Sequence, residues 1–266
     1  MIGWLIYSAV DVEKNKYYIQ MYKDKFKEHF IEIKLVIVEE LENMEQYVKC
    51  NKVDFAINRS RNHIMGELLE QKGVRVFNSS SVTRIANNKG ITYEFLKDVV
   101  PFLAVKYGNE IIESKIENKG FEYPYVIKSC SGHGGSQVFL VNNSKEDEQA
   151  IKAMNGQEYV VQQCCSDLGR DVRVYIIGNK IIKAVLRTST ESFKSNYSLG
   201  GKVQEYTLNN EEKAMVKRIV DKLSLDYAGI DFTFHNGKAV FNEIEDAVGA
   251  RMLYQVSDID IVEMYI

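Results

Sequence analysis

The first eighty residues alternate between apolar, strand-like segments and amphipathic helices, and this alternation restricts the fold more than any other feature of the chain. Strands are predicted over residues 2–7, 31–37, 53–57 and 74–77. Between the first two, Tyr18, Tyr22 and Phe26 recur every four residues, which is the spacing of one helix face. Strands that are separated by helices pair in parallel through right-handed crossovers. The sequence therefore predicts a small parallel α/β domain over residues 1–78.

After residue 78 the pattern changes to short strands and tight turns. Further strands are predicted over residues 102–107, 125–128, 138–141, 159–163, 172–177, 180–186, 229–234 and 238–244. Helices are predicted over residues 144–154 and 210–223. Gly178-Asn179 separates two adjacent strands, as the turn of a tight hairpin does. The later two thirds of the chain are therefore predicted to be α+β, with mainly antiparallel sheets.

Composition excludes several classes of protein. The 34 Lys and Arg residues face 37 Asp and Glu residues, so the net charge is −3 and a strongly basic nucleic-acid-binding domain is excluded. No apolar run is long enough for a membrane span, and the apolar N-terminus is too short for a signal peptide. The four cysteines form no CxxC pair, which argues against a zinc ribbon. We expect reduced cysteines, a cytoplasmic protein, and neither a nucleic-acid nor a membrane partner.

A glycine-rich loop follows the strand that ends at Lys128. It contains Gly132, Gly134 and Gly135, and a second strand returns after it. Glycines let backbone N–H groups approach an anion closely, and the lysine adds a positive charge. The lysine precedes the glycines and no helix follows them, so this is not a Walker A loop. The pattern indicates phosphate binding, and the alternative is a flexible hairpin loop.

The last hairpin carries carboxylates. Its loop, residues 235–237, predicts a three-residue turn that places Phe234 opposite Lys238. That register puts Asp231 and Glu243 on one face, whereas a two-residue turn would put them on opposite faces. The continuous apolar face on the other side of the hairpin favours the three-residue turn, because register follows the buried pattern.

These carboxylates suggest a metal site. Asp231, Glu243 and Glu245 share the polar face of the predicted hairpin. Clustered carboxylates repel one another unless a cation lies between them, and oxygen ligands of this kind suit Mg²⁺ shared with nucleotide phosphates. The alternative is a solvated acidic strand face.

Basic residues occur at positions that a ligand could reach. Arg173 lies within a predicted strand, where a buried arginine needs an anionic partner, and Arg187 follows on the next strand. Arg59 directly follows the strand over 53–57, and ligands of parallel sheets bind beyond the carboxyl ends of the strands. Arg251 lies close after the last hairpin and could bind a substrate carboxylate. The alternatives are a solvated loop arginine for Arg59 and a salt-bridged surface arginine for Arg251.

In their order along the chain, these features resemble the ATP-grasp superfamily and, within it, the RimK-type ligases. The resemblance spans about 78–249, and the residues before it resemble the small domain that precedes ATP-grasp modules. The matching pieces are 78–79 with Lys89, 125–128 with the glycine-rich loop, 161–163, 171–174, Arg187, 193–196 with 200–201, 228–231 and 242–245.

The resemblance implies a two-lobed module over residues 79–266, with lobes over 79–162 and 163–266. It also implies a reaction that joins a carboxylate to an amine, with ATP cleaved to ADP and phosphate through an acyl phosphate. The implied cofactors are ATP and Mg²⁺, for which Mn²⁺ could substitute. The implied partners are small carboxylate and amine substrates, such as amino acids or peptides. A second copy of this chain, in a homodimer, is a further candidate partner.

Carried over position by position, the resemblance assigns roles to individual residues. The nucleotide-binding positions are Lys89, Lys128, Gly134, Gly135, Gln163, Cys164, Asp171, Lys194, Ser195 and Asn196. Among them, Gln163 and Cys164 resemble the hinge that meets adenine, and Asp171 resembles the ribose-side contact. The metal ligands are Asp231, Glu243 and Glu245. In the main hypothesis Arg173 and Arg187 would steady the acyl phosphate. Arg59 and Arg251 are the expected substrate-facing residues, on the grounds of position given above.

The chain departs from the family pattern at three places. Glu245 stands where the family has Asn, Gln163 stands where it has Glu, and residues 246–249 replace a Ser-Pro-Gly loop. The main hypothesis is an ATP-dependent carboxylate–amine ligase. The alternatives are another ATP-grasp chemistry, such as a D-alanine–D-alanine-type ligase or a phosphotransferase, and a nucleotide-binding regulatory protein that has lost turnover.

Overall fold

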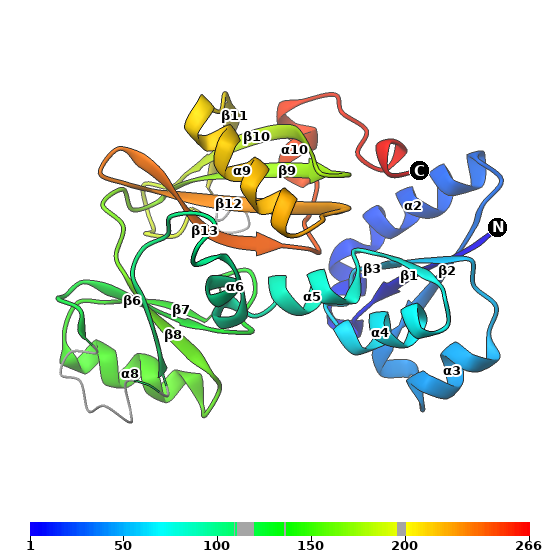
Figure 1. The fold of residues 1–266 in the computed structure, drawn as a ribbon, viewed down its shortest axis with the longest axis horizontal. Coiled ribbons are helices and arrows are strands. Elements are labelled where there is room, and N and C mark those ends of the chain that lie inside the picture. Colours follow the sequence, from blue (N-terminus) through cyan, green and yellow to red (C-terminus); the bar gives the residue numbers. More distant parts are fainter. Residues whose placement is uncertain (109, 111–119, 136, 196–200) are drawn as a thin grey trace.

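Three β-sheets succeed one another along the chain in the computed structural model, which describes residues 1–108, 110, 120–135, 137–195 and 201–266 (Figure 1). They occupy residues 2–77, 105–163 and 170–245. The combination of one parallel and two antiparallel sheets confirms the predicted fold class. The limits of the domain and of the two lobes stay predictions. No helix in the described ranges is both long and apolar enough to cross a bilayer.

The N-terminal sheet is parallel, as predicted. Its strands, in spatial order, are β2 (Glu32–Ile37), β1 (Ile2–Tyr7), β3 (Phe55–Asn58) and β4 (Arg75–Phe77). Its main helices are α1 (Ala9–Val12), α2 (Lys16–Glu28), α3 (Met44–Cys50) and α4 (His63–Gln71). Trp4 and Ile6 belong to the core that contains α3 and α4, while Leu5 and Tyr7 belong to the core that contains α2. The central strand is therefore buried on both faces, which explains its continuous apolar sequence.

The second sheet is antiparallel and carries the glycine-rich loop. Its strands, in spatial order, are β5 (Val105–Tyr107), β8 (Tyr159–Gln163), β6 (Tyr125–Ser129) and β7 (Val138–Val141). Helix α8 (Ser144–Met154) packs Ala150 and Met154 against this sheet. Helices α5 (Ser80–Ala86) and α6 (Lys89–Leu96) lead from the first sheet to the second (Figure 1). The glycine-rich loop joins β6 to β7, so its position depends on this small sheet.

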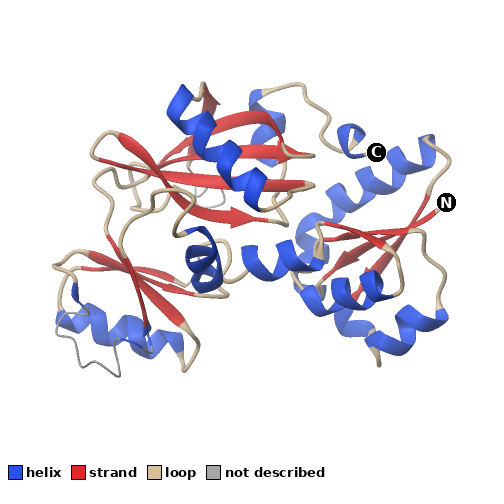
Figure 2. Ribbon diagram, in the orientation of Figure 1, coloured by secondary structure: helices blue, strands red, loops and turns tan. Residues whose placement is uncertain are grey.

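The third sheet is antiparallel. Its strands, in spatial order, are β11 (Lys202–Tyr206), β10 (Lys180–Thr188), β9 (Arg170–Ile177), β12 (Tyr227–His235) and β13 (Lys238–Glu245). Helix α9 (Asn210–Lys222) crosses one face, whose side chains are apolar, and α10 (Arg251–Val256) packs on the other side (Figure 2). Alternation along β9 puts Val172 and Val174 on the α9 face and Asp171 and Arg173 on the opposite face.

The sequence did not predict β11 or α10. Strand β11 has the polar sequence KVQEY and lies at the edge of its sheet, so it shows no apolar run. Helix α10 has six residues, too few for a recognisable helical repeat. Strand β11 is held by its pairing with β10, and α10 by its contacts with β10 and β11.

The predicted three-residue turn in the last hairpin is wrong. His235 pairs with Lys238, so the turn has two residues, Asn236 and Gly237, and both have positive φ angles (51° and 74°). Two such residues form the tight turn whose twist matches that of the flanking strands. Asparagine and glycine are the residues that tolerate these angles best.

A β-bulge nevertheless brings the two carboxylates together. Phe232 pairs with Phe241, but Asp231 pairs with Glu243, so Asn242 is the extra residue on β13. The extra residue reverses the facing of the strand beyond it. Asp231 and Glu243 are therefore directly opposite each other on one face, as predicted. The prediction obtained this arrangement from a three-residue turn, whereas in the structure a two-residue turn and a bulge together produce it. The two-residue turn, in contrast, places Phe241 opposite Phe232 and in the apolar core.

The two-residue turn predicts a stability difference. Replacing Asn236 with Ala should lower the free energy of unfolding by about 1 kcal/mol, because a residue with a Cβ and no short polar side chain is strained at a positive φ. Replacing Asn236 with Gly should be tolerated. Urea unfolding followed by circular dichroism measures both. Asn210→Ala at the start of α9 is the matched control, and equal stabilities of Asn236→Ala and Asn210→Ala would contradict the turn.

Candidate active site

One face of the third sheet gathers charged residues from four strands. Asp231 on β12 is directly opposite Arg173 on β9 and Glu243 on β13. Arg187 on β10 is directly opposite Asp171 on β9. Residues that are opposite each other on neighbouring strands point to the same side of a sheet. The register therefore assembles on one surface residues that lie up to 72 positions apart in the sequence.

Two arginines enclose the carboxylate of Asp231. Arg173 donates from Nε and Nη2 to its two oxygens at 2.8 and 2.7 Å, and Arg187 Nη2 donates to Oδ2 at 2.6 Å. Asp231 is completely buried. Burial acts to raise the pKa of Asp231, but Arg173 and Arg187 outweigh it and lower the pKa to about 2. The carboxylate is therefore ionised, and both of its oxygens are engaged.

Each arginine also binds a second carboxylate. Arg187 donates from Nε and Nη2 to Asp171 at 2.5 and 2.7 Å, and Arg173 Nη2 lies 2.6 Å from Glu245. Burial raises the pKa of Asp171, and Arg187 opposes that shift. A buried arginine with bidentate carboxylate partners has a fixed orientation. Both guanidinium groups are thus held in place at the wall of a cavity.

Two lysines, one from β6 and one from α6, lie close to the bulge of β13. Lys128, at the end of β6, donates from Nζ to Asn242 Oδ1 at 2.8 Å. Lys89, the first residue of α6, donates to the carbonyl oxygen of Gly132 at 2.7 Å and lies 3.6 Å from Glu243. Burial lowers the pKa of Lys128 to about 8, although Glu243 partly counters it. Asn242 was not predicted as a site residue, because only the bulge turns its side chain toward Lys128.

A cavity of about 120 Å³ lies between the second and third sheets. Of the predicted nucleotide-binding residues, those that line it are Lys89, Lys128, Gly134, Gly135, Gln163, Asp171, Lys194 and Ser195. Lys194 Nζ donates to the carbonyl oxygen of Gly135 at 2.5 Å. Cys165 lines the cavity in the place expected for Cys164. Asn196 lies outside the described residues. We call this cavity the inner pocket.

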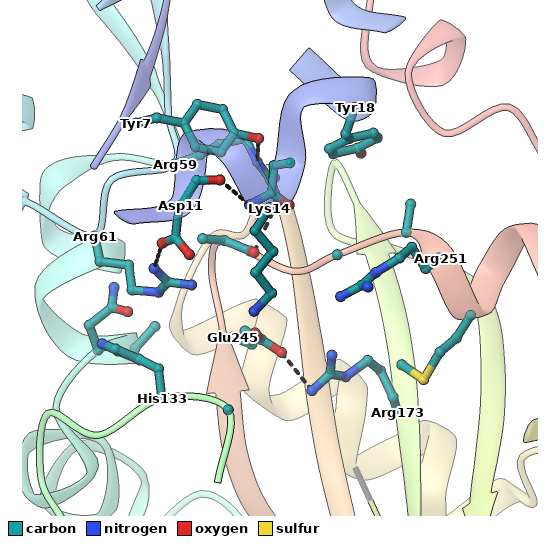
Figure 3. A pocket seen from close by; sticks show the side chains of 18 of the residues that line it. Tyr7, Asp11, Lys14, Tyr18, Arg59, Arg61, His133, Arg173, Glu245 and Arg251 are labelled. Atoms are coloured by element: carbon teal, nitrogen blue, oxygen red, sulfur yellow. Dashed lines mark hydrogen bonds and ion pairs between the residues drawn. The ribbon is translucent and has the colours of Figure 1, made fainter. Parts of the chain in front are cut away.

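A second cavity, of about 290 Å³, lies between the N-terminal sheet and the charged face of the third sheet (Figure 3). We call it the outer pocket. Its walls include Arg173 and Glu245 from the third sheet and Arg59 and Arg61 from the N-terminal domain. The residues that line both pockets are Lys89, Gly132, Gly134, Arg187 and Glu243. The pockets therefore adjoin, and positively charged groups lie at their junction.

Arg59 lines the outer pocket but is tied to the protein. It donates from Nε to the Tyr7 hydroxyl at 2.8 Å and from Nη2 to the carbonyl oxygens of Ala247 and Val248 at 3.0 and 2.8 Å. Only 4% of its surface is exposed. It therefore links the N-terminal domain to the loop that follows β13. Arg59 lines the same cavity as Arg173, and its contact with substrate stays a prediction.

Arg251, the other predicted substrate residue, also lines the outer pocket. It is exposed, and its guanidinium group points into the cavity (Figure 3). The sequence did not point to two other lining residues, Lys14 and Arg61. Arg61 forms an ion pair with Asp11. No signal marked Lys14 or Arg61, because only the packing of the N-terminal domain on the third sheet turns them toward the cavity.

The residues fit a hard cation in part. The side chains of Glu243 and Glu245 are about one third exposed and line the outer pocket, and oxygen ligands of this kind suit Mg²⁺. Asp231, in contrast, has both oxygens engaged by arginines. Within the described ranges, no three His, Cys, Asp or Glu side chains are close enough together to hold a metal ion. Metal binding by Asp231 would require it to exchange an arginine for the ion.

The family can now be stated. A model of the RimK-like ATP-grasp domain matches residues 81–266. The chain belongs to the RimK-like ATP-grasp family. This confirms the resemblance seen in the sequence, and the family uses ATP and Mg²⁺.

Related sequences occur in several bacteria. An uncharacterised protein of Mycoplasma pneumoniae is 32% identical over 253 residues, which cover 94% of this chain and 85% of that protein. A probable α-L-glutamate ligase of Vibrio vulnificus is 27% identical over 233 residues, which cover 86% of this chain and 68% of that protein. The similarity therefore extends into the N-terminal domain, beyond the residues that the family model matches.

Solved structures share the fold. A RimK-domain ATP-grasp protein of Sphaerobacter thermophilus superposes with a TM-score of 0.77 at 19% identity, over 100% of this chain and 98% of that chain. The ATP-grasp ligase PsnB, complexed with a precursor variant, Mg and ADP, superposes with a TM-score of 0.70 at 15% identity, over 98% and 95%. At these identities the likeness establishes the ATP-grasp fold of the whole chain.

The buried ion pairs in this RimK-like protein predict a large stability effect. Replacing Arg187 with Met leaves Asp171 and Asp231 buried with fewer partners, and breaking such a pair costs about 3–5 kcal/mol. The free energy of unfolding, measured with urea, should fall by about 3 kcal/mol or more. Arg84→Met, at an exposed position on α5, is the matched control and should change it by less than about 0.5 kcal/mol. Equal stabilities would contradict the network.

Proposed function

We propose that this protein is an ATP-dependent ligase that joins a carboxylate to an amine through an acyl phosphate. The observation that supports it most is the pair of adjoining pockets with Lys89, Arg187 and Glu243 at their junction. A phosphoryl group transferred between two bound substrates must pass such a junction. The relative from Vibrio vulnificus carries the name of a ligase.

In this proposal the inner pocket binds ATP. Lys128 and Lys194 attract the phosphates, and the glycine-rich loop with Gly134 and Gly135 approaches them with backbone N–H groups. Gln163 and the cysteines that follow meet the adenine, and Asp171 lies on the ribose side. Mg²⁺ or Mn²⁺ bound by Glu243 and Glu245, and by Asp231 after exchange, would neutralise phosphate charge.

The reaction then proceeds in two steps. An oxygen of the substrate carboxylate forms a bond to the γ-phosphorus, and the bond from that phosphorus to the bridging oxygen of ADP breaks. The amine nitrogen next attacks the carbonyl carbon of the acyl phosphate. Inorganic phosphate leaves and the nitrogen loses a proton. Arg173 and Arg187, already oriented by their carboxylate partners, stabilise the negative charge that develops in both steps.

One observation favours a second candidate, a nucleotide-binding regulatory protein without turnover. Asp231, a ligand in the metal site that the family pattern implies, is bound by two arginines, and Glu245 stands where the pattern has Asn. If Asp231 stays bound to the two arginines and does not bind the metal ion, ATP would bind in the inner pocket without being cleaved. A D-alanine–D-alanine-type ligase or a phosphotransferase would use the same inner pocket with another occupant in the outer one.

A coupled ADP-release screen over libraries of carboxylates and amines, with Mg²⁺ present, tests the ligase. Release that requires both a carboxylate and an amine, with an amide product detected by mass spectrometry, is the expected result. With a carboxylate alone, added hydroxylamine should trap the acyl phosphate as a hydroxamate. ADP release that needs neither substrate, or tight ATP binding with no release under any condition, would contradict the ligase. The second of these results would support the regulatory protein.

The pKa of Lys128 predicts how ATP binding depends on pH. The protonated lysine binds phosphate, and in the free protein burial has lowered its pKa to about 8. Above that pH the proton must be taken up again on binding, so ATP affinity should fall by up to about tenfold per pH unit. Titration calorimetry from about pH 7 to pH 9.5 measures it. Lys128→Arg keeps its charge and should show a flatter dependence, while a wild-type affinity that is constant over this range would contradict the role.

A further inference from the structure

Two adjacent cysteines lie at the inner pocket, and the ligase reaction uses neither thiol. Cys164 and Cys165 directly follow β8, and both are half-buried and free. Cys165 lines the cavity of about 120 Å³, together with Lys128 from the second sheet and Thr233 from the third. Reactive cysteines are typically found as partly exposed thiols beside a cation.

The contacts within this pair make one sulfur the nucleophile. The Cys164 thiol donates a hydrogen bond to Cys165 Sγ, which lowers the pKa of Cys165 and raises that of Cys164. Burial acts against the shift at Cys165, whereas Thr233 and Lys128 lower its pKa further. As a thiol, Cys165 donates to the carbonyl oxygen of Asp167 over a long 3.7 Å, and ionisation gives up that contact. When the pair loses a proton, the negative charge therefore lies on Cys165, next to the cavity.

The other two cysteines of the chain lack these features. Cys130 is buried, and burial raises its pKa. Cys50, the last residue of α3, is exposed but lines neither the inner nor the outer pocket. A thiol reagent should therefore distinguish Cys165 from both, and Cys50 is a residue that can be replaced without change to either pocket.

We propose that Cys165 is a thiol-modification site for a small disulfide, and that the attached group occupies the inner pocket. In the reaction, the Cys165 sulfur attacks one sulfur atom of the disulfide R–S–S–R. The bond between the two sulfur atoms of the reagent breaks and a mixed disulfide forms on Cys165, while R–S⁻ leaves and takes a proton from solvent. An excess of thiol reverses the exchange. That the attached group takes the place of a nucleotide rests on the proposed function.

Cys164 assists this reaction without forming a disulfide of its own. Neighbouring residues have Cα atoms about 3.8 Å apart, whereas disulfides usually join Cα atoms about 4.4–6.8 Å apart. A disulfide between Cys164 and Cys165 would be strained, so the mixed disulfide persists. Cys164 is thus a positioning residue that acts through its hydrogen bond to Cys165. The pair would make nucleotide binding depend on the ratio of small disulfide to thiol around the protein.

The reagent 2,2′-dithiodipyridine tests the site, because it is a small disulfide that is uncharged at neutral pH and releases a coloured thione. The full chain with Cys50→Ser is the background. One thione per chain should be released rapidly, mass spectrometry should find one pyridylthio group on Cys165, and a further Cys165→Ser should abolish the rapid phase.

The pH dependence of the rapid phase tests the role of Cys164. A further Cys164→Ala should raise the midpoint of the pH–rate profile by about one pH unit or more, because the thiolate of Cys165 loses a hydrogen-bond donor. Cys164→Ser keeps a donor and is the matched control, which should retain the profile of the background protein.

Nucleotide tests where the attached group lies. ATP with Mg²⁺, at about ten times its Kd, should slow the rapid phase about tenfold, because only the free protein reacts. The modified protein should bind ATP about tenfold or more weakly in titration calorimetry. Dithiothreitol should restore the affinity. Cys165→Ser, treated in the same way, should keep the affinity that it had before treatment.

Several results would overturn the site: a rapid phase that persists in Cys165→Ser, a pH profile that Cys164→Ala leaves unchanged, or a disulfide between the two cysteines in place of the attached group. Bound nucleotide that does not slow the reaction, with an ATP affinity that modification does not change, would overturn the location. If ATP does not bind to the untreated protein, the proposed function fails, while rapid modification that depends on Cys164 stands. If amide formation proceeds undiminished in the modified protein, the ligase stands and the location fails.

Discussion

The rest of the structure depends on the buried ion pairs among Asp171, Arg173, Arg187 and Asp231. Charges removed from water are costly, and each of these side chains is stabilised only while its partners stay in place. The network connects β9, β10 and β12 on one face of the third sheet. The opposite face carries the apolar core that packs on α9. The same pairs that make the sheet rigid hold two guanidinium groups at the walls of the pockets.

The bulge at Asn242 connects this network to the glycine-rich loop. It turns the Asn242 amide toward Lys128 on the second sheet and brings Glu243 opposite Asp231. Lys89 joins the same cluster from α6 through Gly132. One extra residue in a strand therefore aligns groups from two sheets and a helix. Such irregularities often occur next to active sites, because they redirect a side chain without loss of the surrounding sheet.

The two halves of the site have different origins in the chain. The inner pocket is lined by residues between Lys89 and Glu243, which include eight of the predicted nucleotide-binding residues. The N-terminal domain closes the outer pocket, where Arg59 holds the loop that replaces the family's Ser-Pro-Gly segment. In the proposed function, the ATP-grasp module would bind the nucleotide, and the packing of the N-terminal domain would influence the choice of substrate.

Local pattern in the sequence was enough to predict the strands other than β11, the parallel first sheet, the glycine-rich loop and the ordered motifs of the family, because strand and helix periodicity and glycine conformation are properties of neighbouring residues. The tertiary structure alone decided the bulge at Asn242, the arginine partners of Asp231 and the convergence of Lys14 with Arg251. Each of these depends on contacts between residues far apart in the chain. Register and burial are settled only when whole sheets and helices pack together.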